Sequence, residues 1–207
     1  LNVLKENKKI VFFLNPPYAT TCNFGNKNKN EEGNDTIINN EMKINGMKRC
    51  SDNLYGQFLY NIMKIKRSYR LTNCHICIFC PTLFLTGESY IEFRKEFFKD
   101  FTFNTAIQFK ASEFADVSDS WGISFSIWDC GKNSDNQTFL YNMVDNQDGE
   151  VKNISTKNVY NIDNAESLTH WTKFLIKKEK TYDAPLITIV RQPHIDKHWP
   201  RANISSY

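Results

Sequence analysis

The feature that most constrains this chain is a short apolar run that stops at two consecutive prolines. Residues 10–14 read Ile-Val-Phe-Phe-Leu, and Asn15-Pro16-Pro17-Tyr18 follows directly. An uninterrupted apolar run of this length predicts a strand buried on both faces. Because proline fixes φ and has no N–H to donate, the strand must end in a rigid turn. Open α/β sheets bind ligands beyond the carboxyl ends of their strands, so this corner is the first candidate site.

The corner offers two hydrogen-bond acceptors beside an aromatic ring. The Asn15 side chain and the Pro16 carbonyl both carry oxygen acceptors, and the Tyr18 ring follows them in the chain. This combination suits a planar amine. A turn that merely ends a core strand is the structural alternative.

The tetrapeptide resembles motif IV of the amino-methyltransferases that use S-adenosylmethionine, and within them the adenine-specific DNA methyltransferases of restriction–modification systems. Similar tetrapeptides occur in glutamine methyltransferases acting on release factors and in guanine methyltransferases acting on ribosomal RNA. The wider context is similar to the DNA-modifying group, with a long polar loop followed by segments 54–60, 79–82 and 114–128 in the same order.

The resemblance implies a mechanism and a set of catalytic residues, Asn15, Pro16, Pro17 and Tyr18. Asn15 and the Pro16 carbonyl would accept hydrogen bonds from the exocyclic amine of a flipped adenine, and Tyr18 would stack on the base. The methyl group would pass from S-adenosylmethionine without a covalent enzyme intermediate. Asn15 would also contact that cofactor, and asparagine at this position favours adenine over cytosine within the family.

The glycine-rich cofactor loop of the family does not occur in this sequence. The family places Phe-x-Gly-x-Gly upstream of the motif, whereas the eight glycines here never form that spacing. We therefore expect the second half of a catalytic domain. Residues 1–207 alone should bind S-adenosylmethionine weakly and be inactive.

The remaining pattern predicts a partial Rossmann-like methyltransferase fold of the α/β class. A helix capped by Ser51 or Asp52, an apolar strand at 74–80 and a helix at 88–100 imply parallel crossovers. Segments 103–109 and 121–127 then alternate with period two and predict an antiparallel hairpin at the sheet edge.

We divide the chain into residues 1–130, the half-domain, and 131–207, an extension leading toward a target-recognition region. The extension holds weaker signals for a strand at 138–144 and a helix at 165–176.

The polar stretch 21–53 has little periodicity, and we expect either a structureless insertion or a lid that meets DNA phosphates. The basic residues that could make such contacts are Lys27, Lys29, Lys43, Lys48 and Arg49. Basic residues also gather at the carboxyl end of the predicted helix that follows this stretch. Their favourable interaction with the helix dipole can explain this position without DNA, and contact with DNA is the alternative.

Composition and residue spacing bear on three other properties, namely nucleic-acid binding, membrane insertion and metal binding. The net charge of +3 is too small to indicate nucleic-acid binding by itself, and no apolar run is long enough to span a membrane. We expect a cytoplasmic protein with reduced cysteines. Cys74, Cys77 and Cys80 are three residues apart on a strand, which cannot aim them all at one metal ion. His194 and His198 are interpreted as surface residues, so no metal site is predicted.

Two rival functions remain open. One is a glutamine methyltransferase, in which the same acceptors would grip a side-chain amide. The other is a non-catalytic remnant or partner subunit that binds DNA or protein, which the missing cofactor loop favours. If the motif strand is normally central, its exposed edge would be covered by a second subunit, a second copy or residues 1–9.

Overall fold

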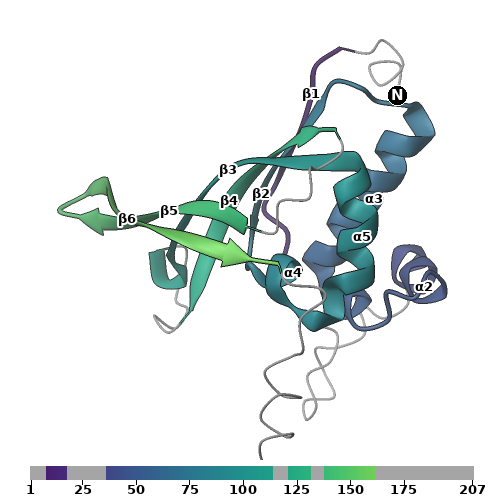
Figure 1. Cartoon of the computed structure of the whole chain (residues 1–207), viewed down its shortest axis with the longest axis horizontal. Helices are drawn as coiled ribbons and strands as arrows, with labels where there is room; N and C mark the ends of the chain where they lie inside the picture. Colours follow the sequence, from purple (N-terminus) through teal and green to yellow (C-terminus); the bar gives the residue numbers. More distant parts are fainter. Residues whose placement is uncertain (1–7, 18–35, 114–120, 132–137, 162–207) are drawn as a thin grey trace, which may run out of the picture. The chain divides into compact units, whose positions relative to one another are not determined.

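A computed structural model describes residues 8–17, 36–113, 121–131 and 138–161, which lie in one compact unit, Leu1–Asp163. A second unit, Asn164–Tyr207, lies outside the described residues, as does the predicted helix at 165–176. Figure 1 shows the elements. In chain order they are β1 (Ile10–Leu14), α2 (Ile37–Ile44), a 3-10 turn (Cys50–Asp52), α3 (Leu54–Tyr69), β2 (Cys74–Cys80), α4 (Leu83–Thr86), a 3-10 turn (Glu88–Tyr90), α5 (Ile91–Asp100), β3 (Phe101–Lys110), a 3-10 turn (Ala111–Glu113), β4 (Gly122–Cys130), β5 (Thr138–Gln147) and β6 (Glu150–Tyr160).

The strands form one mixed six-stranded sheet in the order β1-β2-β4-β3-β5-β6. β1 is parallel to β2, and β3 is parallel to β5, while the other neighbours are antiparallel. Because β2 and β3 are both antiparallel to β4, they run in the same direction and are joined by a crossover through α4 and α5. The predicted mixture of helices and parallel strands is confirmed.

The predicted antiparallel pair is confirmed as β3 and β4, but its predicted place at the sheet edge is wrong. β4 lies between β2 and β3, and β5 pairs with the far side of β3. β5 and β6, which follow residue 130, therefore extend the same sheet. β5 confirms the strand predicted at 138–144, whereas the sequence analysis did not predict β6.

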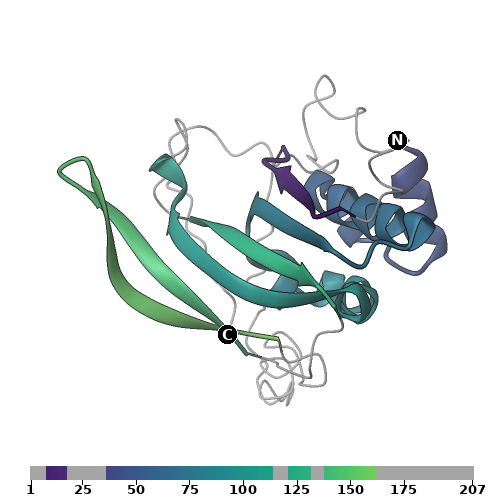
Figure 2. The same cartoon turned by 90° about the horizontal axis from the view of Figure 1, so that it is seen from above.

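The helices α3 and α5 lie side by side on one face of the sheet (Figures 1 and 2). The alternate residues of β2 that face them, Cys74, Ile76, Ile78 and Cys80, are completely buried. Trp128 of β4 anchors this core, and its ring lies edge-on to those of Phe84 and Phe97. Such aromatic contacts add to the stabilisation from burying apolar area.

The other face of β1 is not buried, contrary to the prediction. Val11 is 50% exposed and Phe13 is 67% exposed, whereas the alternate residues Ile10, Phe12 and Leu14 pack against the core. The reason lies in the topology, because β1 is an edge strand of the sheet and the described helices cover only one face.

Helix α3 begins one residue later than the predicted caps allow. Ser51 and Asp52 belong to a 3-10 turn, and Asn53 is the N-cap residue, without a side-chain capping bond. The Ser51 carbonyl instead accepts hydrogen bonds from Asn39 Nδ2 and Gln57 Nε2, both at 2.8 Å. The turn is thus held by buried amides rather than by a cap.

The stretch 21–53 is not structureless throughout. Residues 18–35 lie outside the described part, but α2 follows, with the Thr36 hydroxyl accepting a hydrogen bond from the Asn39 backbone N–H at 2.9 Å. Asn39 and Met42 are buried against the neighbouring elements. The prediction of a long loop is therefore wrong for its second half.

Candidate functional site

The corner at Asn15-Pro16-Pro17 stands at the carboxyl end of β1. Because Leu14 pairs with Ile78 in a parallel register, the corner and Pro81 lie at the same edge of the sheet. The Pro16 side chain is buried, while Asn15 and Pro17 are exposed. Asn15 is thus an exposed residue directly before a buried proline. Tyr18, the fourth predicted catalytic residue, lies outside the described residues.

The predicted phosphate contacts are only partly described. Lys48 and Arg49 are exposed in the turn between α2 and the 3-10 turn before α3. Lys27 and Lys29 lie outside the described residues. Lys48 and Arg49 belong to the connection between α2 and α3, whereas the Asn15 corner ends β1, so we describe them as two candidate regions.

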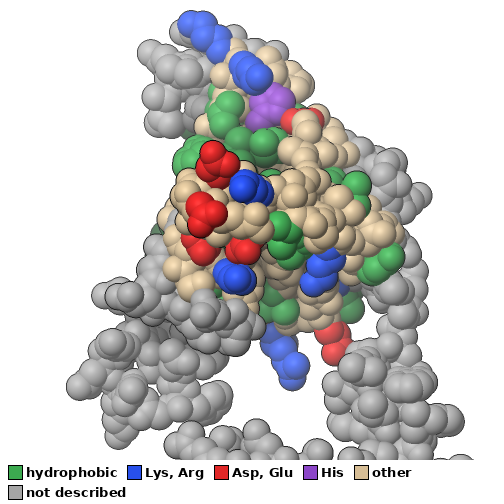
Figure 3. Space-filling view, turned by 90° about the vertical axis from the view of Figure 1, so that its left-hand side faces the viewer, with side chains coloured by type: hydrophobic (Ala, Val, Ile, Leu, Met, Phe, Trp, Pro, Cys, Tyr) green, Lys and Arg blue, Asp and Glu red, His purple; other side chains and the backbone are tan. Residues whose placement is uncertain are grey.

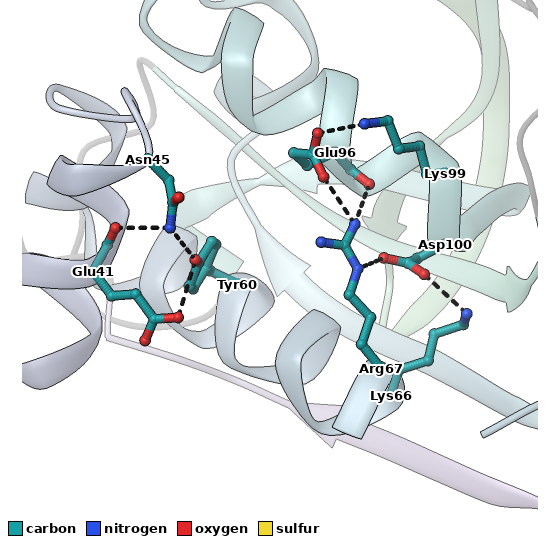
Figure 4. Close-up of polar contacts among 8 residues, drawn as sticks. All are labelled: Glu41, Asn45, Tyr60, Lys66, Arg67, Glu96, Lys99 and Asp100. Carbon is teal, nitrogen blue, oxygen red and sulfur yellow. Dashed lines mark hydrogen bonds and ion pairs between the residues drawn. The ribbon is translucent and has the colours of Figure 1, made fainter. Parts of the chain in front are cut away.

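The basic end of α3 is occupied by acidic partners from α5 (Figure 4). Asp100 accepts hydrogen bonds from Lys66 Nζ at 3.0 Å and Arg67 Nε at 2.6 Å. The Arg67 guanidinium also bonds to a Glu96 carboxylate oxygen at 3.1 Å. These contacts join the two helices, and they favour the structural explanation of this basic group over DNA contact.

A second polar network joins α2 to α3, also shown in Figure 4. The Tyr60 hydroxyl accepts a hydrogen bond from Asn45 Nδ2 at 2.9 Å and donates to Glu41 Oε1 at 3.3 Å. Glu41 also pairs with Lys64. Burial, followed by the nearby Glu41 charge, raises the pKa of Tyr60, so this hydroxyl stays protonated at neutral pH. The network joins α2 to α3, the two helices that flank the connection carrying Lys48 and Arg49.

An aromatic patch covers part of the sheet face that the described helices leave open. It consists of Phe13, Phe79, Phe109 and Phe125, one from each of β1, β2, β3 and β4. The ring centroids of Phe79 and Phe125 are 4.5 Å apart, and Phe13 lies 6.0 Å from each of them. Figure 3 views the side away from the helices and shows hydrophobic side chains on it.

The patch reaches the neighbourhood of the corner, because Phe13 precedes Asn15 by two residues. Sequence reasoning missed it by assigning both faces of β1 and β2 to the core. The sequence did contain a sign that one face of β2 is not part of the core. His75 and Cys77 place polar atoms on the face opposite to that of Cys74 and Ile76.

The cysteines follow the predicted alternation. Cys74 and Cys80 are buried on the helix side, whereas Cys77 is half-buried on the opposite face. Burial raises the pKa of Cys50 to about 12 and raises that of Cys80 further, as expected for thiols that stay protonated.

Near Cys77, His75 Nδ1 lies 2.6 Å from Asp129 Oδ1, and Asn104 Nδ2 donates to Asp129 Oδ2 at 2.7 Å. Within the described ranges no group of three or more His, Cys, Asp or Glu side chains is arranged to hold a metal ion. His194 and His198 lie outside them. None of the helices in the described part is both long and apolar enough to cross a membrane.

Comparison with known proteins gives structural matches alone. No protein-family model matches the chain. No curated protein matches it either.

Three solved structures are similar to part of this chain at low identity. A modification subunit assigned to a type I restriction enzyme of Vibrio vulnificus YJ016 is 17% identical, with a TM-score of 0.43, over 72% of this chain and 28% of that protein. DrdV in a complex with DNA is 18% identical, with a TM-score of 0.43, over 65% of this chain and 14% of that one. A component of a type I restriction–modification assembly is 16% identical, with a TM-score of 0.41, over 83% and 30%. The chain thus spans less than a third of each of these proteins.

Proposed function

We propose that this chain is the second half of the catalytic domain of an adenine-specific DNA methyltransferase that uses S-adenosylmethionine. The observation that carries the proposal is the Asn15-Pro16-Pro17 corner, which stands at the carboxyl edge of the parallel β1–β2 pair with Pro16 buried and Asn15 exposed. A site at this edge is typical of open α/β sheets. The proposal includes a role in restriction–modification and a cytoplasmic location.

The corner supplies alignment rather than acid–base chemistry. The Asn15 side-chain oxygen and the Pro16 carbonyl are acceptors on a backbone that two prolines stiffen. Two acceptors that bind the two hydrogens of an exocyclic amine direct its lone pair away from them. S-adenosylmethionine supplies the electrophilic methyl group. Holding the nucleophile in one orientation accounts for catalysis without a covalent intermediate on the enzyme.

Tyr18 and the basic residues complete the proposal for DNA. Stacking of the flipped adenine on the Tyr18 ring would contribute roughly 1–3 kcal/mol and so offset part of the cost of removing the base from the duplex. Lys48 and Arg49, with Lys27 and Lys29, would neutralise phosphates. Arg67 and Lys66 are left out of this set because Asp100 and Glu96 already occupy them.

The test is the substitution Asn15→Ala in a protein that joins residues 1–207 to the cofactor-binding half that the resemblance implies. Loss of one aligned polar contact is expected to lower the rate of methyl transfer to DNA by about 100-fold or more. Asn40→Ala is the matched control, because Asn40 is an exposed amide on α2. An Asn15→Ala variant as active as the Asn40→Ala control would overturn the proposal.

A further inference from the structure

Two cysteines face each other across the antiparallel β2–β4 pair. His75 is paired with Asp129 and Ile76 with Trp128. Continuing this register by one residue places Cys74, the first residue of β2, opposite Cys130, the last residue of β4. Directly opposed residues have their side chains on the same face of the sheet.

The spacing of such a pair fits a disulfide. Opposed Cα atoms in antiparallel sheets are about 4.5 or 5.5 Å apart, depending on the type of pair, and disulfides join Cα atoms about 4.4–6.8 Å apart. The two thiols also interact in the reduced protein. Burial, and then the charge and hydrogen bonding of the Cys130 thiol, raise the pKa of Cys74.

The two thiols differ in their access to solvent. Cys74 is completely buried, whereas Cys130 is partly exposed and its thiol donates to the Leu71 carbonyl at 3.4 Å. A small reagent in solution therefore reaches Cys130 first, with Cys74 beside it as a second thiol. A thiol that solvent reaches, with a second thiol beside it to resolve a mixed disulfide, is an arrangement that can form a disulfide. The raised pKa of Cys74 keeps most of this thiol protonated at neutral pH and slows the second step.

We propose that Cys74 and Cys130 form a dithiol site that a low-molecular-weight disulfide, such as oxidised glutathione, converts into a bond between β2 and β4. The Cys130 thiolate attacks one sulfur of oxidised glutathione and releases one glutathione thiolate. The Cys74 thiolate then attacks the Cys130 sulfur of the mixed disulfide and releases the second. Two protein thiols are oxidised, one disulfide is reduced, and the two cysteine protons pass to the two glutathiones.

The other cysteines of the described part do not compete for this bond. Cys77 points to the opposite face of the sheet, and Cys80 lies at the far end of β2 from Cys74. Cys50 is buried between α2 and α3, where its thiol donates to the Met47 carbonyl at 3.2 Å. Among the described cysteines, the geometry therefore allows this disulfide between Cys74 and Cys130.

The expected effect of oxidation is on stability rather than on the Asn15 corner. Cys74 begins β2, whereas the corner lies at the carboxyl edge of the sheet, so the bond forms at the opposite edge. Closing residues 74–130 into a ring restricts the unfolded chain and is expected to raise Tm by roughly 5–15 °C. The proposal does not depend on methyltransferase activity.

The test uses chain 1–207 with Cys22→Ser, because Cys22 lies outside the described residues. The reduced protein is incubated with oxidised glutathione under native conditions, digested, and analysed by mass spectrometry, with Tm followed by circular dichroism. We expect a Cys74–Cys130 peptide lacking two hydrogens and a higher Tm, both retained in a Cys77→Ala variant and both lost in Cys130→Ala.

Other outcomes would overturn the proposal. One is a folded protein that carries glutathione on Cys130 without the cross-link. Another is a cross-link that forms only in denaturant, since this would place the thiols apart in the folded state. The third is an unchanged or lower Tm in the cross-linked protein. A Cys130→Ala variant that does not fold leaves the comparison between the parent and Cys77→Ala to decide.

Discussion

Replacement of Asp100 by asparagine tests whether the basic end of α3 serves the fold. The Asp100 side chain is 9% exposed and belongs to the last residue of α5, where the helix dipole disfavours a negative charge. Lys66 and Arg67 offset this cost at 3.0 and 2.6 Å. Asparagine keeps the size of the side chain and removes its charge, so two cations lose their common partner.

The expected loss of stability in Asp100→Asn depends on how exposed the side chains of Lys66 and Arg67 are. Removing one partner of a buried ion pair costs about 3–5 kcal/mol. The side chain of Lys66 is only 15% exposed, but that of Arg67 is 45% exposed and retains Glu96. Because Arg67 can reach water and asparagine still accepts one hydrogen bond, we expect a loss of about 2–3 kcal/mol in the free energy of unfolding. This corresponds to a Tm decrease of roughly 4–12 °C.

Urea denaturation followed by circular dichroism measures this loss, with an unchanged slope as evidence of an unchanged fold. Glu92→Gln is the matched control. Its exposed pair with Lys95, at 2.6 Å, is expected to contribute less than about 0.5 kcal/mol. If Asp100→Asn costs no more than the control, the cluster does not stabilise the protein, and Lys66 and Arg67 become candidates for DNA contact.

Three further predictions follow from the same contacts. Phe97→Ala should lower the free energy of unfolding by about 3–5 kcal/mol, and Phe13→Ala by less than about 1 kcal/mol, in urea denaturation; equal losses would mean that Phe13 is covered in solution. Replacing Lys48 and Arg49 together by alanine should leave Tm unchanged and lower the salt dependence of DNA binding, with a slope smaller by about 2; an unchanged slope contradicts their role. The hydrogen bond from Lys99, followed by the one from Arg67 to the carboxylate, lowers the pKa of Glu96. The stabilisation that Glu96 contributes is therefore present above its unfolded pKa and lost as the pH falls through its folded pKa. The stability difference between the parent and Glu96→Gln should therefore shrink from pH 7 to pH 3, and a constant difference would contradict this assignment.

Strong local periodicity explains what the sequence could predict. The apolar runs of β1 and β2, the stripe of α3 and the alternation of β3 and β4 each identify their element without tertiary context. Helix α2 was missed because Asn39 and Asn40 interrupt its apolar pattern. In the structure α2 is held by the Thr36 cap, by the buried Asn39 amide and by the hydrogen bonds of Asn45 and Glu41 to Tyr60, all contacts that its local apolar pattern does not reveal.

The position of each strand depended on pairings that are distant in sequence. Nothing local to β1 indicates that it is an edge strand with Phe13 exposed, since its composition is that of a central strand. Strand β6 had a usable signal, because Asp148 and Gly149 both adopt positive φ in the tight turn that joins it to β5. This Asp-Gly pair is a strong hairpin signal that the polar flanking residues concealed.

The same distinction applies to the site. The end of β1 before Pro16 and Pro17 could be predicted because proline constrains the backbone locally, whereas the role of Asn15 stays a prediction. The aromatic patch beside it could not be predicted, since it forms only when four strands are brought together. Local chemistry therefore identified the candidate acceptors, and the topology determined what surrounds them.

The most direct test of the central claim identifies the methylated product. A protein that joins residues 1–207 to the cofactor-binding half is incubated with labelled S-adenosylmethionine and with DNA or a release factor. Nucleosides and peptides are then separated by mass spectrometry. The account predicts label on the exocyclic nitrogen of adenine, lost in Asn15→Ala. Label on a glutamine side chain or on cytosine, or adenine labelling that persists in Asn15→Ala, would contradict it.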